Sequence, residues 1–186
     1  MKSCRRGHLH KVRALLCLLL LPAFVSSAAG GTAQVAAPIS PMKSKPGKPQ
    51  PEARLYEFAR RYTAAWCSQD AASVAAFFSP NGSLAINGGA PAVGRTAIAQ
   101  AARGFMTAFP DLQITMDDLL DQGGKVIYKW TLSGTNTGPG GTGQRVHISG
   151  YEEWRIGSDS LVAESLGHYD SAEYQRQLEH GAAGKK

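Results

Sequence analysis

A glutamate stands among apolar residues in a stretch that alternates as a β-strand does. Between residues 144 and 156 the even positions carry Val146, Ile148, Gly150, Glu152, Trp154 and Ile156. Successive strand side chains point to opposite faces, so the apolar face must point inward and must take Glu152 with it. Burial disfavours the charged carboxylate and raises its pKa, which prepares the group to donate a proton or a hydrogen bond. Alternatively, Glu152 lies near a sheet edge or pairs with a core arginine and has no function.

A second group of polar residues ends the last predicted strand, residues 161–169. If this strand is regular, one of its faces carries Val162, Glu164, Leu166, His168 and Asp170. His168 and Asp170 are two residues apart, so the carboxylate can approach the imidazole and raise its basicity. We therefore take Glu152, His168 and Asp170 as the candidate catalytic residues. Two structural roles compete with this interpretation: His168 as a hydrogen-bonded, partly buried histidine, and Asp170 as the N-cap of a helix over 171–179.

Motifs for cofactors and metals are incomplete in this sequence. Residues 138–143 match the spacing GxGxxG, but a predicted strand follows instead of a helix, which favours a flexible hairpin loop at a pocket rim. Glu164, His168 and Asp170 could in principle bind a metal ion, yet the inward faces offer no second histidine and no cysteine cluster. We expect neither a metal nor a cofactor.

The spacing of apolar residues predicts the elements that must position these side chains. Apolar residues recur at three- and four-residue steps over 52–67 and again from Thr96 to Phe109, which predicts two helices. Asp70 is expected to cap a short helix between them, and Thr96 to cap the later helix, which Pro110 must end.

Strands are expected around the second long helix. A short strand over 83–87 precedes it, and four more follow it, over 112–120, 125–133, 144–156 and 161–169. Helices followed by an antiparallel meander predict an α+β fold in which one face of the sheet packs against the helices.

The first 28 residues have the composition of a signal peptide. Basic residues precede an apolar run over 14–25, and small residues follow it. The run is short for a membrane span, and Pro22 interrupts it. We expect cleavage near Ala28 or Ala29, export to the periplasm or the outside, and no membrane attachment after cleavage. A retained anchor is the alternative.

The rest of the chain divides into a linker, one domain and a tail. Residues 29–52 are rich in proline and lysine and are expected to be disordered, as are 181–186, whereas 53–180 form the domain. The chain has a formal charge of +6, but residues 53–180 hold ten Lys or Arg and thirteen Asp or Glu, a net charge of −3. Because the positive charge lies in the leader and tails, we expect no nucleic-acid partner.

Several stretches resemble the SnoaL-like polyketide cyclases of the nuclear transport factor 2-like superfamily. Residues 105–112 resemble that family's F-x-x-A-F-P-D helix end, 130–138 its W-T-x-x-G-T-H-x-G motif and 142–146 its T-G-K-x-V motif. The resemblance covers nearly all of residues 53–180. It implies a cone-shaped α+β fold, with a curved antiparallel sheet wrapped around a long helix and a cavity between them. Members are often dimers, so a homodimer is among the expectations.

The resemblance also implies roles for single residues. Glu152 falls where the related ketosteroid isomerases have a protonated aspartate, which agrees with the strand-face argument. The base of those isomerases should fall near Ile86 or Asn87, where no acid stands, so steroid isomerisation is not expected. The aspartate of the cyclases maps to the last strand, which favours Asp170, and Asn136 replaces a frequent histidine.

Two functions remain open for such a pocket. One is cofactor-independent acid–base catalysis (cyclisation, isomerisation or hydrolysis) on a small apolar carbonyl compound. The other is a non-catalytic domain of the periplasm that binds a small molecule or a partner. The candidate substrate-binding residues are Tyr62, Trp66, Trp130, Asn136, Trp154 and Glu164.

Overall fold

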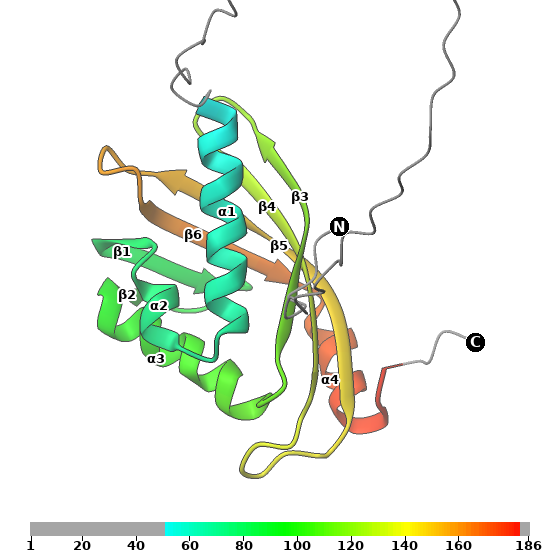
Figure 1. Ribbon diagram of the computed structural model, residues 1–186. Coiled ribbons are helices and arrows are strands. Elements are labelled where there is room, and N and C mark those ends of the chain that lie inside the picture. The colour runs from blue at the N-terminus through cyan, green and yellow to red at the C-terminus, as the bar shows by residue number, and fades with distance from the viewer. Residues whose placement is uncertain (1–50, 183–186) are drawn as a thin grey trace, which may run out of the picture. The chain divides into compact units, whose positions relative to one another are not determined.

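The computed structural model describes residues 51–182, which form four helices and six strands. In chain order they are α1 (Pro51–Cys67), α2 (Ala71–Ala75), β1 (Phe78–Ile86), β2 (Ala92–Val93), α3 (Gly94–Ala108), β3 (Gln113–Asp121), β4 (Val126–Thr135), β5 (Arg145–Ile156), β6 (Val162–Tyr169) and α4 (Ser171–His180) (Figure 1). The expected leader and nearly all of the expected linker lie outside the described residues. Among the described residues, no helix is long and apolar enough to cross a membrane.

The six strands form one curved sheet in the order β2-β1-β6-β5-β4-β3. The predicted meander from β3 to β6 is confirmed, and each of its neighbouring pairs is antiparallel. The parallel pairing of β1 with β6 was not predicted, nor was β2. The short strand expected over 83–87 is part of the longer β1, whose pairing register with β6 shifts between Phe78 and Ser83.

Helices α1, α2 and α3 lie on one face of the sheet (Figure 1), and α4 lies beside β5, which it contacts. The core between the first three helices and the sheet is rich in aromatic residues. Tyr62 of α1 has no exposed surface and makes edge-to-face contacts with Tyr128 of β4 and Trp154 of β5. Burying side chains of this size supplies a large share of the folding free energy. The α+β fold expected from the sequence is confirmed.

Local signals predicted the helix ends with one exception. The Asp70 side chain caps α2 by accepting a hydrogen bond from the Ala72 amide, as expected. The prediction that Thr96 caps α3 is wrong, because α3 begins at Gly94 and Val93 occupies the N-cap. Strand β2 ends at Val93, directly before the helix. Gly94 changes the direction of the chain with a φ of 78°, which glycine adopts without strain.

Strand β6 is irregular at one residue, and this decides which side chains face the helices. Its pairing with β5 runs Arg155↔Glu164 and then Ile156↔Val162, so Ala163 is skipped. An extra residue in one strand reverses the alternation of faces beyond it. The inward face therefore carries Val162, Ser165, Gly167 and Tyr169, and the regular alternation assumed for this strand is wrong.

Candidate functional site

A pocket opens between the sheet and helices α1 and α3. It comprises about 530 Å³, including the part that is open to solvent. Its aromatic walls are Trp66, Phe105, Tyr128, Trp130 and Tyr169. Leu84, Ile86, Ile114 and Leu132 add aliphatic surface, and Gly167 and Glu152 complete the lining. Glu152 is the one acidic residue among them, and no lysine, arginine or histidine of residues 51–182 lines the pocket.

Glu152 is only 7% exposed, and three hydrogen-bond donors contact its carboxyl. Oε2 accepts hydrogen bonds from Ser165 Oγ at 2.6 Å, Trp154 Nε1 at 2.8 Å and the Tyr62 hydroxyl at 3.1 Å. Oε1 lies 3.3 Å from the same Tyr62 hydroxyl. A carboxylate oxygen accepts about two good hydrogen bonds. Oε2 is therefore saturated, whereas Oε1 keeps capacity for a further partner.

Burial raises the pKa of Glu152, and the hydrogen bonds from Ser165, Trp154 and Tyr62 offset only part of that effect. Among the described residues Glu152 forms no salt bridge, so the alternative of a core arginine partner does not apply. Burial also raises the pKa of Tyr62 well above its ordinary value, and the nearby Glu152 charge adds to this. Tyr62 therefore stays protonated and serves as a donor.

Tyr128 lines the pocket with its ring, because its hydroxyl is engaged elsewhere. Thr63 Oγ1 donates to the Ala59 carbonyl at 2.9 Å and lies 2.7 Å from the Tyr128 hydroxyl. Since the threonine proton is used, Tyr128 must donate to Thr63. The Tyr128 ring stacks on Trp154 with 4.7 Å between centroids. Tyr128 thus contributes its ring to the pocket wall, and the Trp154 ring stacks on it beside Glu152.

The structure brings five of the sequence-predicted site residues together. Glu152, Trp66 and Trp130 line the pocket. Tyr62 and Trp154 do not line the pocket. They donate hydrogen bonds to the Glu152 carboxyl and so hold it in position. These five residues come from α1, β4 and β5, which the apolar spacing had identified correctly.

His168 and Glu164 lie on the opposite face of the sheet from Glu152, so their predicted inward placement is wrong. The His168 ring stacks on Tyr151 with 4.8 Å between centroids, and its Nε2 lies 3.8 Å from Glu153 Oε1, beyond hydrogen-bond distance. The Glu164 side chain is 44% exposed and lies 3.5 Å from Arg155. The physical reason is the skipped residue Ala163, which reverses the faces of β6.

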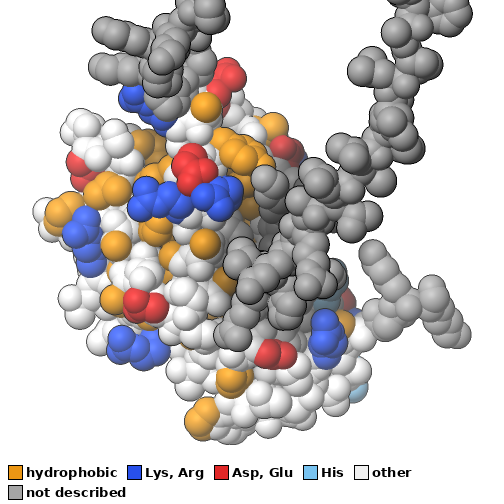
Figure 2. All heavy atoms as spheres, in the orientation of Figure 1, with side chains coloured by type: hydrophobic (Ala, Val, Ile, Leu, Met, Phe, Trp, Pro, Cys, Tyr) orange, Lys and Arg blue, Asp and Glu red, His pale blue; other side chains and the backbone are white. Residues whose placement is uncertain are grey.

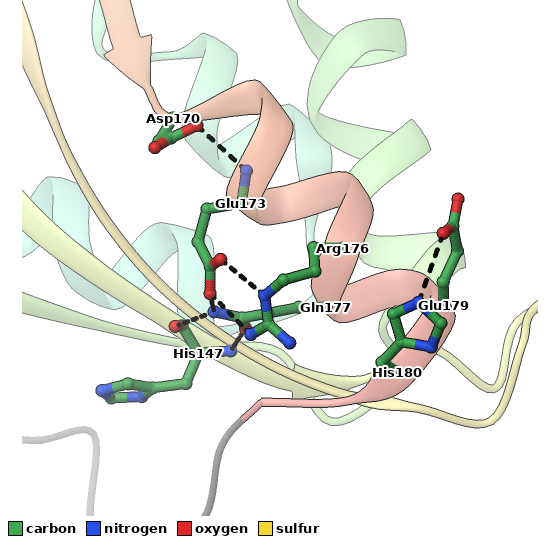
Figure 3. Close-up of polar contacts among 7 residues, drawn as sticks. All are labelled: His147, Asp170, Glu173, Arg176, Gln177, Glu179 and His180. Carbon is green, nitrogen blue, oxygen red and sulfur yellow. Dashed lines mark hydrogen bonds and ion pairs between the residues drawn. The ribbon is translucent and has the colours of Figure 1, made fainter.

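Asp170 caps α4 and does not approach His168. Its Oδ1 accepts a hydrogen bond from the Glu173 amide at 2.9 Å, as Figure 3 shows. This is the capping role that competed with catalysis in the sequence interpretation. Asp170 is exposed and is not among the residues that line the pocket.

Asn136 organises the glycine loop between β4 and β5. Its Nδ2 donates to the Ala108 carbonyl at 3.1 Å, and its Oδ1 accepts from the Thr142 amide at 2.8 Å. The side chain therefore ties the loop to the end of α3, away from the pocket lining. The loop joins two strands, which confirms that the GxGxxG match is a hairpin connection.

The sequence interpretation missed several residues of this site. Ser165 and Gly167 lie on the face of β6 that was assigned to the outside, and only knowledge of the bulge could have found them. Tyr128 shares the alternation of β4 with Trp130 and could have been found from that pattern. Among residues 51–182, no three His, Cys, Asp or Glu side chains are grouped so that they could hold a metal ion.

Comparisons with known proteins bear on the family and the fold. The family model of the SnoaL-like polyketide cyclases matches residues 56–178. TsrD from Streptomyces laurentii is 25% identical, with a TM-score of 0.61 over 70% of this chain and 98% of its own. AclR from Streptomyces galilaeus, named as a candidate hydroxylase, is also 25% identical, with a TM-score of 0.59 over 68% and 96%.

A more distant structure shares the fold alone. It is a protein with a ketosteroid isomerase-like fold from Catenulispora acidiphila, in complex with trimethylamine, and it is 15% identical with a TM-score of 0.59 over 66% of this chain and 92% of its own. Comparison with curated proteins gives no significant match. Because the family model covers most of the chain, and the sheet and helices match structures of this fold, the chain belongs to the SnoaL-like polyketide cyclase family of the nuclear transport factor 2-like fold.

Proposed function

We propose that the domain binds a small, uncharged carbonyl compound in its pocket and that Glu152 exchanges a proton with that compound without a cofactor. The observation that carries the proposal is the state of the Glu152 carboxyl. Three donors saturate Oε2, and Oε1 keeps the capacity to meet a ligand in the pocket that Glu152 lines.

The surroundings of Glu152 suit both protonation states, as a proton carrier requires. Burial among apolar side chains favours the neutral acid, which can donate its proton to a carbonyl oxygen. When the proton leaves, the carboxylate keeps the hydrogen bonds from Ser165, Trp154 and Tyr62, which stabilise its charge. The same group can then take a proton from the carbon next to the carbonyl, so that the acid form is restored.

A specific observation favours non-catalytic binding as the second candidate. Glu152 is the one carboxyl among the described residues that line the pocket, and Tyr128 and Tyr169 stay protonated because burial raises their pKa above the ordinary values. The other two predicted catalytic residues, His168 and Asp170, lie away from the pocket. A pocket with one acid and no separate base suits a receptor for a carbonyl compound as well as an enzyme.

Proton exchange at the carbon next to a carbonyl tests the proposal. Small ketones in D₂O with the wild-type protein should gain deuterium at that carbon, as followed by ¹H NMR. In the Glu152→Gln variant the amide can still donate a hydrogen bond but cannot carry a proton. Exchange should therefore fall by about 100-fold or more, with binding retained within a few-fold.

Glu153→Gln is the matched control. Glu153 neighbours Glu152 but pairs with Lys125 on the other face, so its replacement should leave exchange unchanged. Exchange that survives in Glu152→Gln would refute the proton-transfer role. Ketone binding without exchange in the wild type would establish the non-catalytic alternative.

We also propose that the domain acts outside the cytoplasm. The support is the basic start, short apolar run and small residues of the first 28 residues. This location would bring the pocket into contact with compounds in the periplasm or the medium.

A further inference from the structure

Trp130 presents a buried hydrogen-bond donor that the described residues do not satisfy. Its Nε1 is buried and has no hydrogen-bond partner among them, although the residue lines the pocket. A buried indole N–H normally finds an acceptor, and Trp154 shows the ordinary case by donating to Glu152. An unmatched donor in a pocket wall therefore needs an explanation, and a ligand acceptor supplies one.

The register of the sheet places Trp130 one row away from Glu152. Tyr128, Glu152 and Gly167 are cross-strand neighbours, and the next row on the same face consists of Trp130, Gly150 and Tyr169. Such rows lie about 7 Å apart along the strands. The Glu152 carboxyl and the Trp130 N–H therefore sit in consecutive rows of one surface, and Tyr169, which carries a hydroxyl, shares the row of Trp130.

The absence of a side chain at Gly150 leaves room for the Trp130 ring. A Cβ at this position would lie 2.6 Å from Trp130 Cζ2 and would also meet the His168 carbonyl. Glycine is required here because the indole lies directly on the backbone of β5. The position of the ring is thus set by the sheet.

Gly167 is different, because neither its backbone nor its neighbours require glycine. It lies inside β6, is not among the glycines with positive φ, and would place a Cβ 3.5 Å from the Ala85 carbonyl and 3.8 Å from Glu152 Cγ. These are ordinary van der Waals distances. Glycine inside a strand loses stability for want of a side chain, and it commonly marks a place where a ligand approaches closely. An alanine methyl here would fit the fold but fill pocket space beside Glu152.

We infer that the pocket recognises an uncharged ligand with two oxygen acceptors, one at Glu152 and a second at the Trp130 N–H. Gly167 lets the ligand lie against the sheet beside the acid. The described residues that line the pocket include no cation, so the second acceptor is a neutral carbonyl, ether or hydroxyl oxygen instead of an anionic group. The role of Glu152 in this inference rests on the proposed function, whereas the role of Trp130 does not.

Two probes of equal shape test the second acceptor. 4-Methoxyacetophenone and 4-ethylacetophenone are uncharged and nearly isosteric, and only the first has an ether oxygen opposite its carbonyl. Calorimetric titration of the full chain should give about a 10-fold tighter Kd for the methoxy compound, the usual effect of one hydrogen bond to a buried donor. Trp130→Phe keeps an aromatic wall without the N–H and should abolish this preference, while the Kd of the ethyl compound changes less than about 3-fold.

Gly167→Ala tests the space beside Glu152. Both probes should bind about 10-fold more weakly or worse, and the melting temperature should not fall, because the methyl fits the fold. Gly104→Ala is the control. Gly104 is exposed on α3 and a Cβ there would meet nothing within 4 Å, so both affinities should stay unchanged.

Equal affinity of the two probes for the wild type, a preference that survives in Trp130→Phe, or no binding of either probe would each overturn the inference. Wild-type affinity in Gly167→Ala would overturn the role of Gly167. Failure of the proposed function is seen separately, since proton exchange depends on Glu152 whereas the preference between probes depends on Trp130.

Discussion

At the scale of single residues, two opposing effects act on the pKa of the Glu152 carboxyl. Burial favours the neutral form of Glu152, while Ser165, Trp154 and Tyr62 favour the charged form. The net result is a raised pKa, so the folded protein holds this proton more firmly than the unfolded chain does. The same residue therefore links the chemistry of the pocket to the stability of the domain.

The stability of the domain should depend on pH through Glu152. Because its folded pKa lies above the ordinary value of 4.5, its contribution is complete below about pH 4.5 and is lost as pH rises through the folded pKa. A folded-state pKa that is higher than the unfolded one by one corresponds to about 1.4 kcal/mol of folding free energy. Glu152→Gln cannot ionise, so urea unfolding from pH 4 to pH 8 should show the wild type losing stability relative to this variant. A difference that stays constant or grows with pH would contradict the raised pKa.

At the scale of elements, one bulge decides which residues of β6 reach the pocket. Skipping Ala163 turns Ser165 and Gly167 inward and His168 outward. A strand repeats every two residues, so a single extra residue exchanges the two faces. The inward placement of Ser165, which donates to Glu152, and of Gly167, which lines the pocket, depends on this bulge.

Helix α4 closes an edge of the sheet with a side chain. The pairing of β5 with β6 ends at Gly150 and Tyr169, which leaves the first residues of β5 without that neighbour. The Gln177 amide then occupies both backbone groups of His147, accepting from its N–H at 2.6 Å and donating to its carbonyl at 3.0 Å, as Figure 3 shows. The side chain thus does what another strand would do.

Gln177→Ala should destabilise the domain by about 1–3 kcal/mol, because it leaves two backbone groups of β5 unpaired where Gln177 is now buried. Urea unfolding measures the loss, and hydrogen exchange at the His147 amide should become faster. Gln175→Ala is the control, since Gln175 is exposed and donates only to Glu179 of its own helix. Equal stability of the two variants would show that the contact to His147 contributes little.

At the scale of the whole molecule, charge is distributed unevenly along the sequence. The full chain has a formal charge of +6, whereas residues 53–180 have a net charge of −3. Figure 2 shows basic and acidic side chains interspersed with hydrophobic ones on the face that carries α1 and α3. From the charge balance of residues 53–180 we expect a small-molecule ligand instead of nucleic acid.

Expression of the full chain in a bacterium tests export. If the first 28 residues are a signal peptide, the protein outside the cytoplasm should begin near Ala28 or Ala29, as mass spectrometry of the intact protein would show. Replacing Leu18 and Leu20 by arginine interrupts the apolar run and should keep the protein in the cytoplasm at full length. An exported protein that retains its first residues would instead indicate an anchor.

Short-range patterns in the sequence determined the four helices, the strands other than β2, the α+β class and the inward direction of Glu152. These features depend on the periodicity of neighbouring residues, which a chain carries locally: the steps of α1, the alternation of β5 and the cap at Asp70. The resemblance of residues 105–146 to the SnoaL-like motifs indicated the family for the same reason, since motifs are read along the chain.

Only the tertiary structure decided how the site is assembled. The parallel pairing of β1 with β6 and the contact of Tyr62 with Glu152 join residues that lie far apart in the sequence. The bulge at Ala163 and the hydrogen bond of Ser165 to Glu152 depend on how β5 and β6 pair. Such contacts result from packing the sheet against the helices, and no local pattern encodes them. The bulge in β6 therefore places His168 outside the site and Ser165 and Gly167 inside it, and Asp170 caps α4.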